Sequence, residues 1–224
     1  MSAVKFIAGA FMVYQVASRP ELREQLSLRC NQLMALVIWC LLSPLLLIIT
    51  FFIWRIDGVP LLFAHYRVGK NGKLFQCWKF RTMRRDSEEV LAELLRTDES
   101  ARAEWARDQK LTNDPRITPI GHFLRKSSLD ELPQLLNVIK GEMSLVGPRP
   151  ITVAELARYG SVRWHYVSVA PGMTGLWQIS GRNNTTYAER VEFDREYVER
   201  KSLLGDIAIL LKTVRVVLFR EGAR

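Results

Sequence analysis

The chain has 224 residues, of which 48% are hydrophobic and 25% are charged, and its formal net charge is +9. This length can build one full core, or a modest domain with a membrane element, and the large apolar residues throughout exclude a disordered chain. The positive charge suits an anionic partner such as a membrane surface, a nucleic acid or a phosphorylated substrate. The three cysteines and three histidines have no metal-ligand spacing, so we expect neither a disulfide framework nor a zinc site.

The first predicted element is embedded in a membrane. Met1–Tyr14 is mildly apolar and has no clear cleavage site, so it is not interpreted as a signal peptide; it either lies along a membrane surface or packs on the domain. Leu33–Trp54 contains no charged residue. An unbroken helix of this length rises about 33 Å, enough to cross a hydrocarbon core of about 30 Å.

Ser43 and Pro44 stand at the centre of this apolar stretch, where a proline removes a backbone donor and kinks or breaks a helix. Two halves of about 15 Å each could enter one leaflet and return. Basic residues flank both ends, namely Arg19, Arg23 and Arg29 before the stretch and Arg55, Arg67, Lys70 and Lys73 after it. Because such residues favour the cytoplasmic side, a re-entrant helix fits better than a straight span. A kinked ordinary span is the alternative, since membrane helices tolerate proline.

The remainder of the chain predicts one compact domain without repeats or linkers. Pro60–Met83 alternates and contains Lys70-Asn71-Gly72-Lys73, which is typical of a hairpin. Helices are expected over 86–111, 117–126, 129–140, 152–159, 187–198 and 203–219. The last of these is apolar at helical spacing and has basic residues at its border, which fits a helix in the headgroup region or one packed on the core.

Two adjacent acids, Asp130 and Glu131, are the first candidates for chemistry. Ser128 and Glu131 have the spacing of a capping box, and Pro133 suits the first turn of a helix, so a structural role is the simplest interpretation. A helix start also attracts phosphate and divalent metal, however. The two acids could then divide the work, one attacking phosphorus and the other handling a metal or a proton.

Several cations stand in segments where they could hold phosphate oxygens. Lys79 and Arg81 lie on one face of a predicted strand. Arg149 lies between two prolines that stiffen its backbone, although a purely structural turn is the alternative there. Arg182 lies in a polar loop, and the run PGMTG at 171–175 fits a structural turn.

Taken together, these motifs resemble one family. The resemblance rests on the Ser43-Pro44 insert, KFRTM at 79–83, LRKSSLDELPQLLNVIKGEMSLVGPRP at 124–150, PGMTGLWQISGRN at 171–183 and Tyr197-Val198-Glu199. In these motifs the chain is similar to the monotopic phosphoglycosyl transferases, also called bacterial sugar transferases. The similarity runs from about Asn31 to Val217, and its long central block is highly specific.

The resemblance implies an α/β (α+β) fold in which a compact cytosolic domain carries one re-entrant membrane helix broken at Ser43-Pro44 and interfacial helices. The expected organisation is an N-terminal segment 1–30, the re-entrant helix 31–55 and a catalytic domain 56–224 that ends in a membrane-associated helix. Larger relatives carry further spanning helices and an extra domain, so this chain is expected to be a short form. The implied location is the cytoplasmic face of a bacterial inner membrane.

The implied activity is transfer of hexose 1-phosphate from a UDP-sugar to undecaprenyl phosphate, with release of UMP, as the first membrane step of exopolysaccharide, capsule or O-antigen synthesis. The run GLWQ at 175–178 favours UDP-glucose or UDP-galactose. Membrane lipids are expected partners, a homo-oligomer is allowed, and nucleic acid is not expected. Two other classes stay open: a single-pass membrane protein with a basic binding domain, and a glycosyltransferase that would release UDP.

The resemblance also implies roles for individual residues. Asp130 would be the nucleophile that forms a covalent phospho-sugar intermediate, with Glu131 as its partner, and Mg²⁺ would bind at this pair. Whether Glu131 is a metal ligand or a proton acceptor stays open. Lys79, Arg125 and Arg149 match positions that the resemblance expects to hold phosphates or to fix the site, and Arg81 and Arg182 remain further phosphate-binding candidates from their positions in the sequence.

Overall fold

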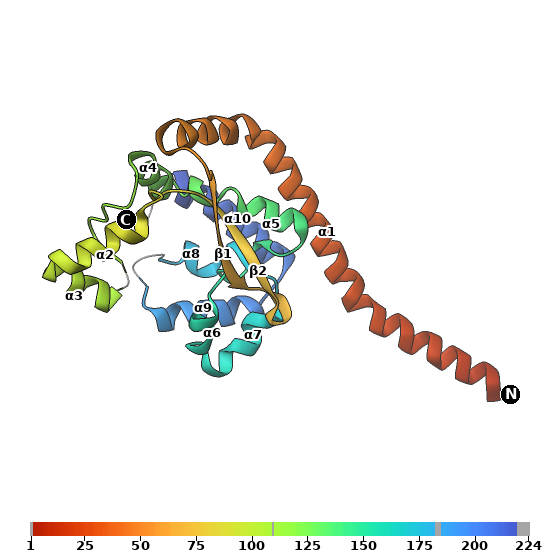
Figure 1. The fold of residues 1–224 in the computed structure, drawn as a ribbon. Coiled ribbons are helices and arrows are strands. Elements are labelled where there is room, and N and C mark those ends of the chain that lie inside the picture. Colours follow the sequence, from red (N-terminus) through yellow and green to blue (C-terminus); the bar gives the residue numbers. More distant parts are fainter. Residues whose placement is uncertain (1, 109, 182–184, 219–224) are drawn as a thin grey trace.

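A computed structural model of the chain describes residues 2–108, 110–181 and 185–218, and it confirms a mixture of helices and small sheets. The helices are α1 (Ser2–Asp57), α2 (Ser87–Thr97), α3 (Glu99–Asp108), α4 (Pro119–Ser127), α5 (Gln134–Lys140), α6 (Val153–Ala157), α7 (Arg163–Ser168), α8 (Leu176–Ile179), α9 (Tyr187–Glu199) and α10 (Leu203–Leu218). Three 3-10 turns are η1 (Lys70–Gly72), η2 (Leu129–Glu131) and η3 (Gly160–Val162). The strands are β1 (Leu62–Val68), β2 (Leu74–Phe80), β3 (Ser144–Val146) and β4 (Gly172–Thr174). Figure 1 shows α1 extending far beyond a domain built from the other elements.

The predicted hairpin is present as the antiparallel pair β1–β2, in which Leu62 lies opposite Phe80. Its turn is η1, where Asn71 (φ 57°) and Gly72 (φ 73°) adopt left-handed backbone conformations that these two residue types tolerate well. A second sheet, formed by the parallel pair β3–β4, was not predicted from the sequence. Strands of three residues are too short to show an alternating pattern.

The apolar helix α1 is not interrupted at Ser43 and Pro44, but it changes direction within its orange part (Figure 1). Pro44 cannot donate to the carbonyl of Cys40, four residues earlier. The Ser43 hydroxyl donates to that carbonyl instead, at 2.8 Å. The Ser-Pro pair therefore bends the helix while the freed carbonyl keeps a hydrogen bond.

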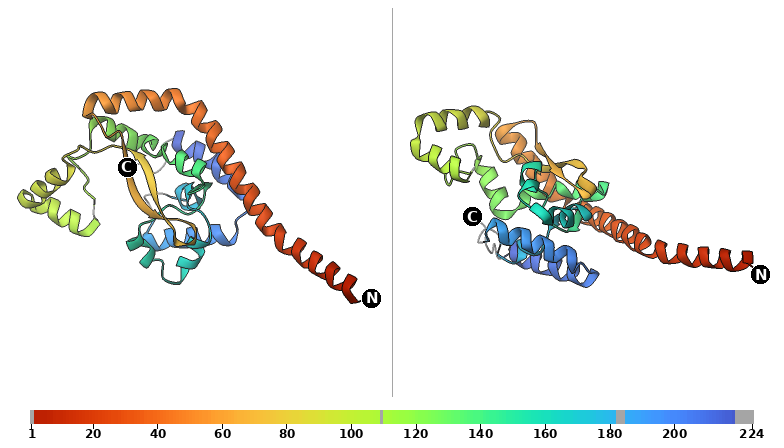
Figure 2. Two further views of the ribbon diagram at one scale, coloured as in Figure 1. Left: turned by 45° about the vertical axis from the view of Figure 1, so that its right-hand side comes forward. Right: turned by 90° about the horizontal axis from the view of Figure 1, so that it is seen from below.

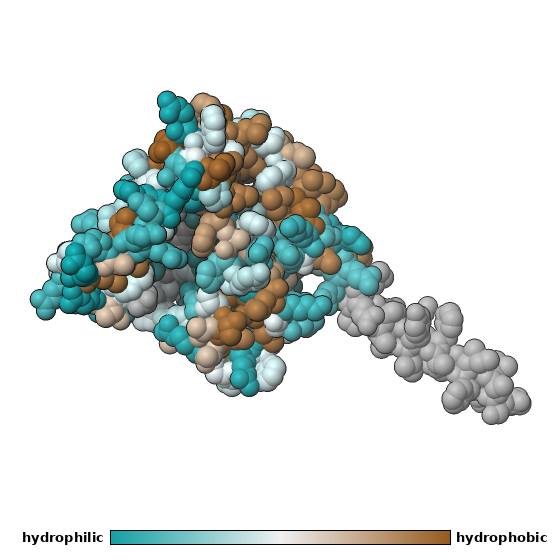
Figure 3. All heavy atoms as spheres, in the orientation of Figure 1, coloured by the Kyte–Doolittle hydropathy of each residue, from teal (hydrophilic) through white to brown (hydrophobic). Residues whose placement is uncertain are grey.

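Both halves of the apolar stretch pack on the same domain. Ala35 is buried in a cluster with residues of β2, α5 and β3, whereas Leu46, Ile49 and Ile53 are buried in a second cluster with Phe80. The opposite side of the helix is exposed and apolar, and Figure 3 shows brown residues gathered along this edge. Among the residues that the structure describes, Glu24–Asp57 is the one helical stretch long and apolar enough to cross a membrane.

Two predicted helices are wrong in their extent. The helix expected over 86–111 is broken at Asp98, whose backbone is extended and whose carboxylate accepts hydrogen bonds from Ser100 and Ala101 at the start of α3. This residue therefore ends α2 and caps α3, and the two helices form a hairpin that projects from the domain (Figure 2). The helix expected over 129–140 is divided into η2 and α5, with Pro133 at the start of α5.

The last helix, α10, has apolar residues on two faces. Ile209 is buried in the same cluster as Ala35, so α10 packs on the domain core. Its outward face is apolar and exposed, with 69% of Leu211 and 58% of Val214 accessible to solvent. Packing on the core is thus observed, and the outward face is also suited to an apolar environment.

Candidate active site

The two adjacent acids lie on η2, the turn between α4 and α5. Ser128, which precedes this turn, has a left-handed backbone (φ 58°), and no side-chain capping hydrogen bond forms at η2. The capping-box interpretation of this segment is therefore wrong. Asp130 and Glu131 instead line a cavity of about 980 Å³.

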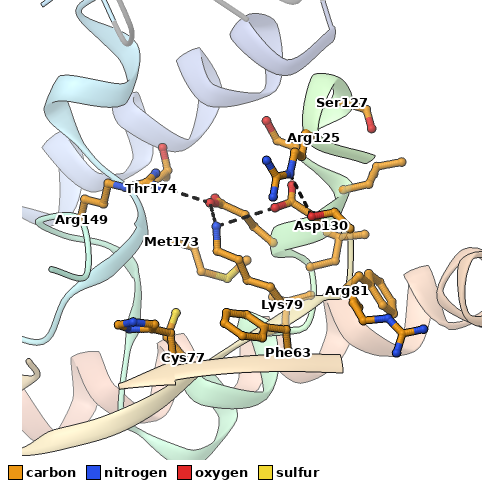
Figure 4. Close-up of a pocket in the computed structure, with 18 of the residues that line it drawn as sticks. Phe63, Cys77, Lys79, Arg81, Arg125, Ser127, Asp130, Arg149, Met173 and Thr174 are labelled. Atoms are coloured by element: carbon orange, nitrogen blue, oxygen red, sulfur yellow. Dashed lines mark hydrogen bonds and ion pairs between the residues drawn. The ribbon is translucent and has the colours of Figure 1, made fainter. Parts of the chain in front are cut away.

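Lys79 at the end of β2 is the cation nearest to the pair. Its Nζ atom lies 2.6 Å from Glu131 Oε1 and 3.7 Å from Asp130 Oδ2. Arg149 approaches from the other side, with its Nη2 atom 3.6 Å from Glu131 Oε1. Figure 4 shows Lys79 pointing toward Asp130 from the strand below. The structure thus brings together four of the predicted site residues from three separate segments.

Burial raises the pKa of Asp130 above its ordinary value, and the neighbouring charge of Glu131 acts in the same direction. Lys79 opposes this rise most strongly among the cations, followed by Arg125 and Arg149. These three cations therefore favour the ionised form of the carboxyl, against the effect of burial. Such a perturbed acid in a cavity is typical of a functional site.

Arg125 on α4 is fixed by a residue that the sequence analysis did not single out. Its Nε atom donates to the hydroxyl of Thr82 at 2.9 Å, and burial lowers the pKa of its guanidinium. The carbonyl of Thr82 accepts the backbone N–H of Thr118 at the start of α4, at 3.0 Å. Thr82 therefore ties both α4 and the Arg125 side chain to the end of the β1–β2 hairpin.

Arg149 follows a backbone segment that is clamped on β4. The N–H of Gly147 donates to the carbonyl of Thr174 at 2.9 Å, and the N–H of Gly172 donates to the carbonyl of Pro148 at 2.8 Å. A Cβ atom on Gly147 would lie only 2.8 Å from the nitrogen of Gly172, so no side chain fits at this contact. The glycine is needed because the two backbones approach closely here. The two hydrogen bonds fix the backbone immediately before Arg149, and with it the position from which the Arg149 side chain extends.

Trp177 on α8 lies between two arginines. The Cζ atom of Arg149 is 5.8 Å from the centre of its ring, and that of Arg190 on α9 is 4.9 Å away. Both distances are within the range of a cation–π interaction. Below this layer lies Asp194, which is 2% exposed and accepts a hydrogen bond of 2.7 Å from the hydroxyl of Tyr159. Trp177 was noted only within the GLWQ run, and no local pattern pointed to Arg190 or Asp194.

One predicted phosphate-binding residue, Arg81, is placed differently. Arg81 is 9% exposed and lines the cavity, but its guanidinium turns toward the end of α1 (Figure 4). There its Nη2 atom donates to the carbonyls of Asp57 and Gly58 and lies 2.8 Å from the Asp57 carboxylate. The observed contacts of Arg81 therefore hold the helix end. Arg182 lies outside the described residues.

The residues at the cavity fit a magnesium ion that is held partly by substrate. Mg²⁺ in phosphate sites commonly takes one or two protein carboxylates together with phosphate oxygens and water. Asp130 and Glu131 supply two such carboxylates, and within the described ranges no group of three or more potential ligands (His, Cys, Asp or Glu) is present. An ion bound by protein alone is therefore not expected here.

Comparison with known proteins identifies the family to which this chain belongs. The model of the family described as bacterial sugar transferase matches residues 23–220. The chain is 59% identical over 189 residues to the UDP-galactose-lipid carrier transferase of Erwinia amylovora, covering 84% of this chain and 39% of that protein. It is 56% identical over 189 residues to the undecaprenyl-phosphate galactose phosphotransferase of Salmonella typhimurium, covering 84% of this chain and 40% of that protein.

A shorter relative matches along most of both chains. The exopolysaccharide production protein ExoY of Rhizobium meliloti is 50% identical over 191 residues, which cover 85% of this chain and 84% of that protein. By contrast, the chain spans only about two fifths of the length of the Erwinia and Salmonella relatives.

Proposed function

Since the chain belongs to the bacterial sugar transferase family, we propose that it transfers a hexose 1-phosphate from a UDP-sugar to undecaprenyl phosphate and releases UMP. The observation that carries this proposal is the adjacent carboxylates of Asp130, which is buried, and Glu131, which is half-buried, held between Lys79 and Arg149. Relatives that match most of this chain have names that include undecaprenyl-phosphate galactose phosphotransferase and exopolysaccharide production protein. The proposed product would therefore begin an exopolysaccharide, capsule or O-antigen, and UDP-galactose or UDP-glucose is the proposed donor.

In the first step, an ionised carboxylate oxygen of Asp130 attacks the phosphorus that is bonded to the sugar. A bond forms between this oxygen and phosphorus while the bond from phosphorus to the UMP oxygen breaks, and UMP leaves with the electron pair. Lys79, Arg125 and Arg149 offset the negative charge of the donor and keep Asp130 ionised. Bound Mg²⁺ would supply further charge neutralisation at the diphosphate, held by Asp130 and Glu131.

In the second step, a phosphate oxygen of undecaprenyl phosphate attacks the same phosphorus. The bond to Asp130 breaks, the carboxylate is restored, and the sugar leaves on a lipid diphosphate. Two successive displacements let a soluble donor and a lipid acceptor use the same carboxylate in turn.

The packing of α1 supports a re-entrant arrangement of the apolar stretch. A helix that spans a bilayer has its two ends on opposite sides, so its two halves cannot both lie on one water-soluble domain. Here Ala35 and Ile53, from the two halves, are both buried against the domain. We therefore place the domain at the cytoplasmic face of the inner membrane, with the exposed side of α1 in one leaflet.

The test is to incubate the purified chain with UDP-galactose or UDP-glucose alone. UMP release and a mass increase on the peptide that contains Asp130 are both expected, and Asp130→Asn should abolish both. Glu192→Gln, at an exposed acid of α9, is the matched control and should retain both. Release of UDP would indicate sugar transfer without phosphate, and UMP release that requires the acceptor and leaves no adduct would contradict the aspartyl intermediate.

A further inference from the structure

The cavity that holds the carboxylate pair also has an apolar wall. Its apolar lining residues include Ile38, Leu135, Leu145, Met173, Leu210 and Val216, and these six come from five elements. A nucleotide sugar is polar along its whole length and gains little from contact with such a surface. The wall is therefore suited to a second ligand that carries an anionic group and an apolar chain.

Two of the helices that form this wall are apolar on their outward sides as well. On α1, Ile38 lines the cavity, whereas Val37 and Leu41 are exposed. On α10, Leu210 lines the cavity, whereas 69% of the neighbouring Leu211 is exposed. A helix with an exposed apolar side is suited to the boundary of a lipid layer. An apolar chain in lipid that contacts the outward sides would thus be next to the cavity wall.

The side of α10 that faces the cavity is fixed by a hydroxyl pair. Thr213 donates to the carbonyl of Ile209 at 2.8 Å, so the 2.8 Å contact between Thr174 and Thr213 has Thr174 as its donor. Leu210, Thr213 and Val216 follow one another at three-residue spacing, which places them on one face of the helix. The hydroxyl pair therefore sets this face of α10 toward β4 and the carboxylate pair.

We propose that this wall, formed by α1 and α10 beside Asp130 and Glu131, binds the first isoprene units of the lipid acceptor. The acceptor's phosphate then reaches Lys79 and Arg149 while the rest of its chain stays in the bilayer. This inference rests on the proposed function, and it assigns Leu210 to recognition of the acceptor and not of the donor. The charge of the cations matches the phosphate, and the apolar wall matches the chain that follows it.

The test compares Leu210→Gln with Leu211→Gln, two adjacent substitutions of which the first is at a residue that lines the cavity and the second at an exposed residue. Transfer is measured to undecaprenyl phosphate and to geranyl phosphate, a short prenyl phosphate that reaches the site from water. For Leu210→Gln we expect the KM for geranyl phosphate to rise about tenfold, the size of one lost leucine contact, and to rise more than the KM for UDP-sugar in acceptor-free UMP release. Leu211→Gln should leave the KM for geranyl phosphate unchanged.

Equal effects of the two substitutions on geranyl phosphate would overturn the inference, because they would mean that α10 serves only as a membrane contact. A second measurement uses the unaltered chain, so that it does not depend on how a variant folds. Geranyl phosphate that carries a photoreactive diazirine should label the peptide that contains Leu210, and added undecaprenyl phosphate should prevent this labelling. Labelling confined to other peptides would also overturn the inference. Failure of the proposed function would look different, since UMP would then not be released even without acceptor.

Discussion

The buried carboxyl of Asp194, which lies beside Tyr159 and Arg190, predicts how the stability of the chain depends on pH. This carboxyl is 2% exposed, and burial raises its pKa to about 6, against the opposing effects of the Tyr159 hydrogen bond and of Arg190. In the unfolded chain the pKa of an aspartate is about 4. Between these two values the folded chain binds more protons than the unfolded chain, so the free energy of unfolding falls as pH rises from 4 to 6.

The magnitude follows from the difference between the two pKa values. A difference of about two pH units corresponds to about 3 kcal/mol of lost stability above pH 6. For a chain of this size, 1 kcal/mol changes Tm by about 2–4 °C, so the full effect is about 6–12 °C. The variant Asp194→Asn cannot ionise and should escape this loss. Its Tm should therefore rise relative to the unaltered chain by about this amount between pH 4 and pH 7.

Thermal unfolding of both proteins in detergent across pH 4–8 is the assay. A fixed difference in Tm between them is expected from the altered amide contacts, so only the pH-dependent part of the difference tests the reasoning. Tyr159→Phe provides a second arm, because it removes the hydrogen bond that lowers the pKa of Asp194. In that variant the decline of Tm should extend to higher pH. Parallel Tm curves for Asp194→Asn and the unaltered chain would refute the assignment of a buried, late-ionising carboxyl.

Three further predictions concern the site and the bend of α1. Lys79→Met removes the cation that most lowers the pKa of Asp130. The pH profile of acceptor-free UMP release should therefore move to higher pH by about 1–2 units. An unmoved profile would contradict the role of this charge. Ser43→Ala removes the hydroxyl that donates to the carbonyl freed by the proline, and should lower the free energy of unfolding by about 1 kcal/mol. Ser43→Thr keeps a hydroxyl and should retain the stability of the unaltered chain. Thermal unfolding of both variants tests this. Trp177→Leu removes the ring beside Arg149 and should raise the KM for UDP-sugar about tenfold, with a smaller change for Trp177→Phe; equal KM values for all three proteins would exclude a cation–π contribution.

Much of the local structure could be predicted from the sequence because it depends on neighbours along the chain. The charge-free run Leu33–Trp54 marks the apolar part of α1, and the Asn71-Gly72 pair marks the hairpin turn. The helix over 187–198 was expected within one residue of α9, whose start is set by a capping box between Thr186 and Glu189. Such features depend on periodicity, turn chemistry and capping, all of which act over a few residues.

Local patterns gave the wrong answer where a single residue had two local options. The spacing of Ser128 and Glu131 predicted a capping box, but Ser128 adopts a left-handed backbone and Glu131 instead contacts Lys79, 52 positions away in the chain. In the sequence, Asp98 was interpreted as one of many charges within a long helix, but its carboxylate caps the next helix. In both cases packing with the rest of the chain decided between conformations of similar local energy.

The sequence by itself determined that this chain carries an apolar helix long enough to cross a membrane, short mixed elements and a pair of adjacent acids. Only the tertiary structure decided that Lys79, Asp130 and Arg149 meet in one cavity and that Arg81, on the same strand end, turns to the end of α1 instead. It also decided that both halves of the apolar stretch lie on one domain. The physical reason is that burial and charge pairing depend on residues brought together by long-range packing, which leaves no periodic trace in the order of the residues.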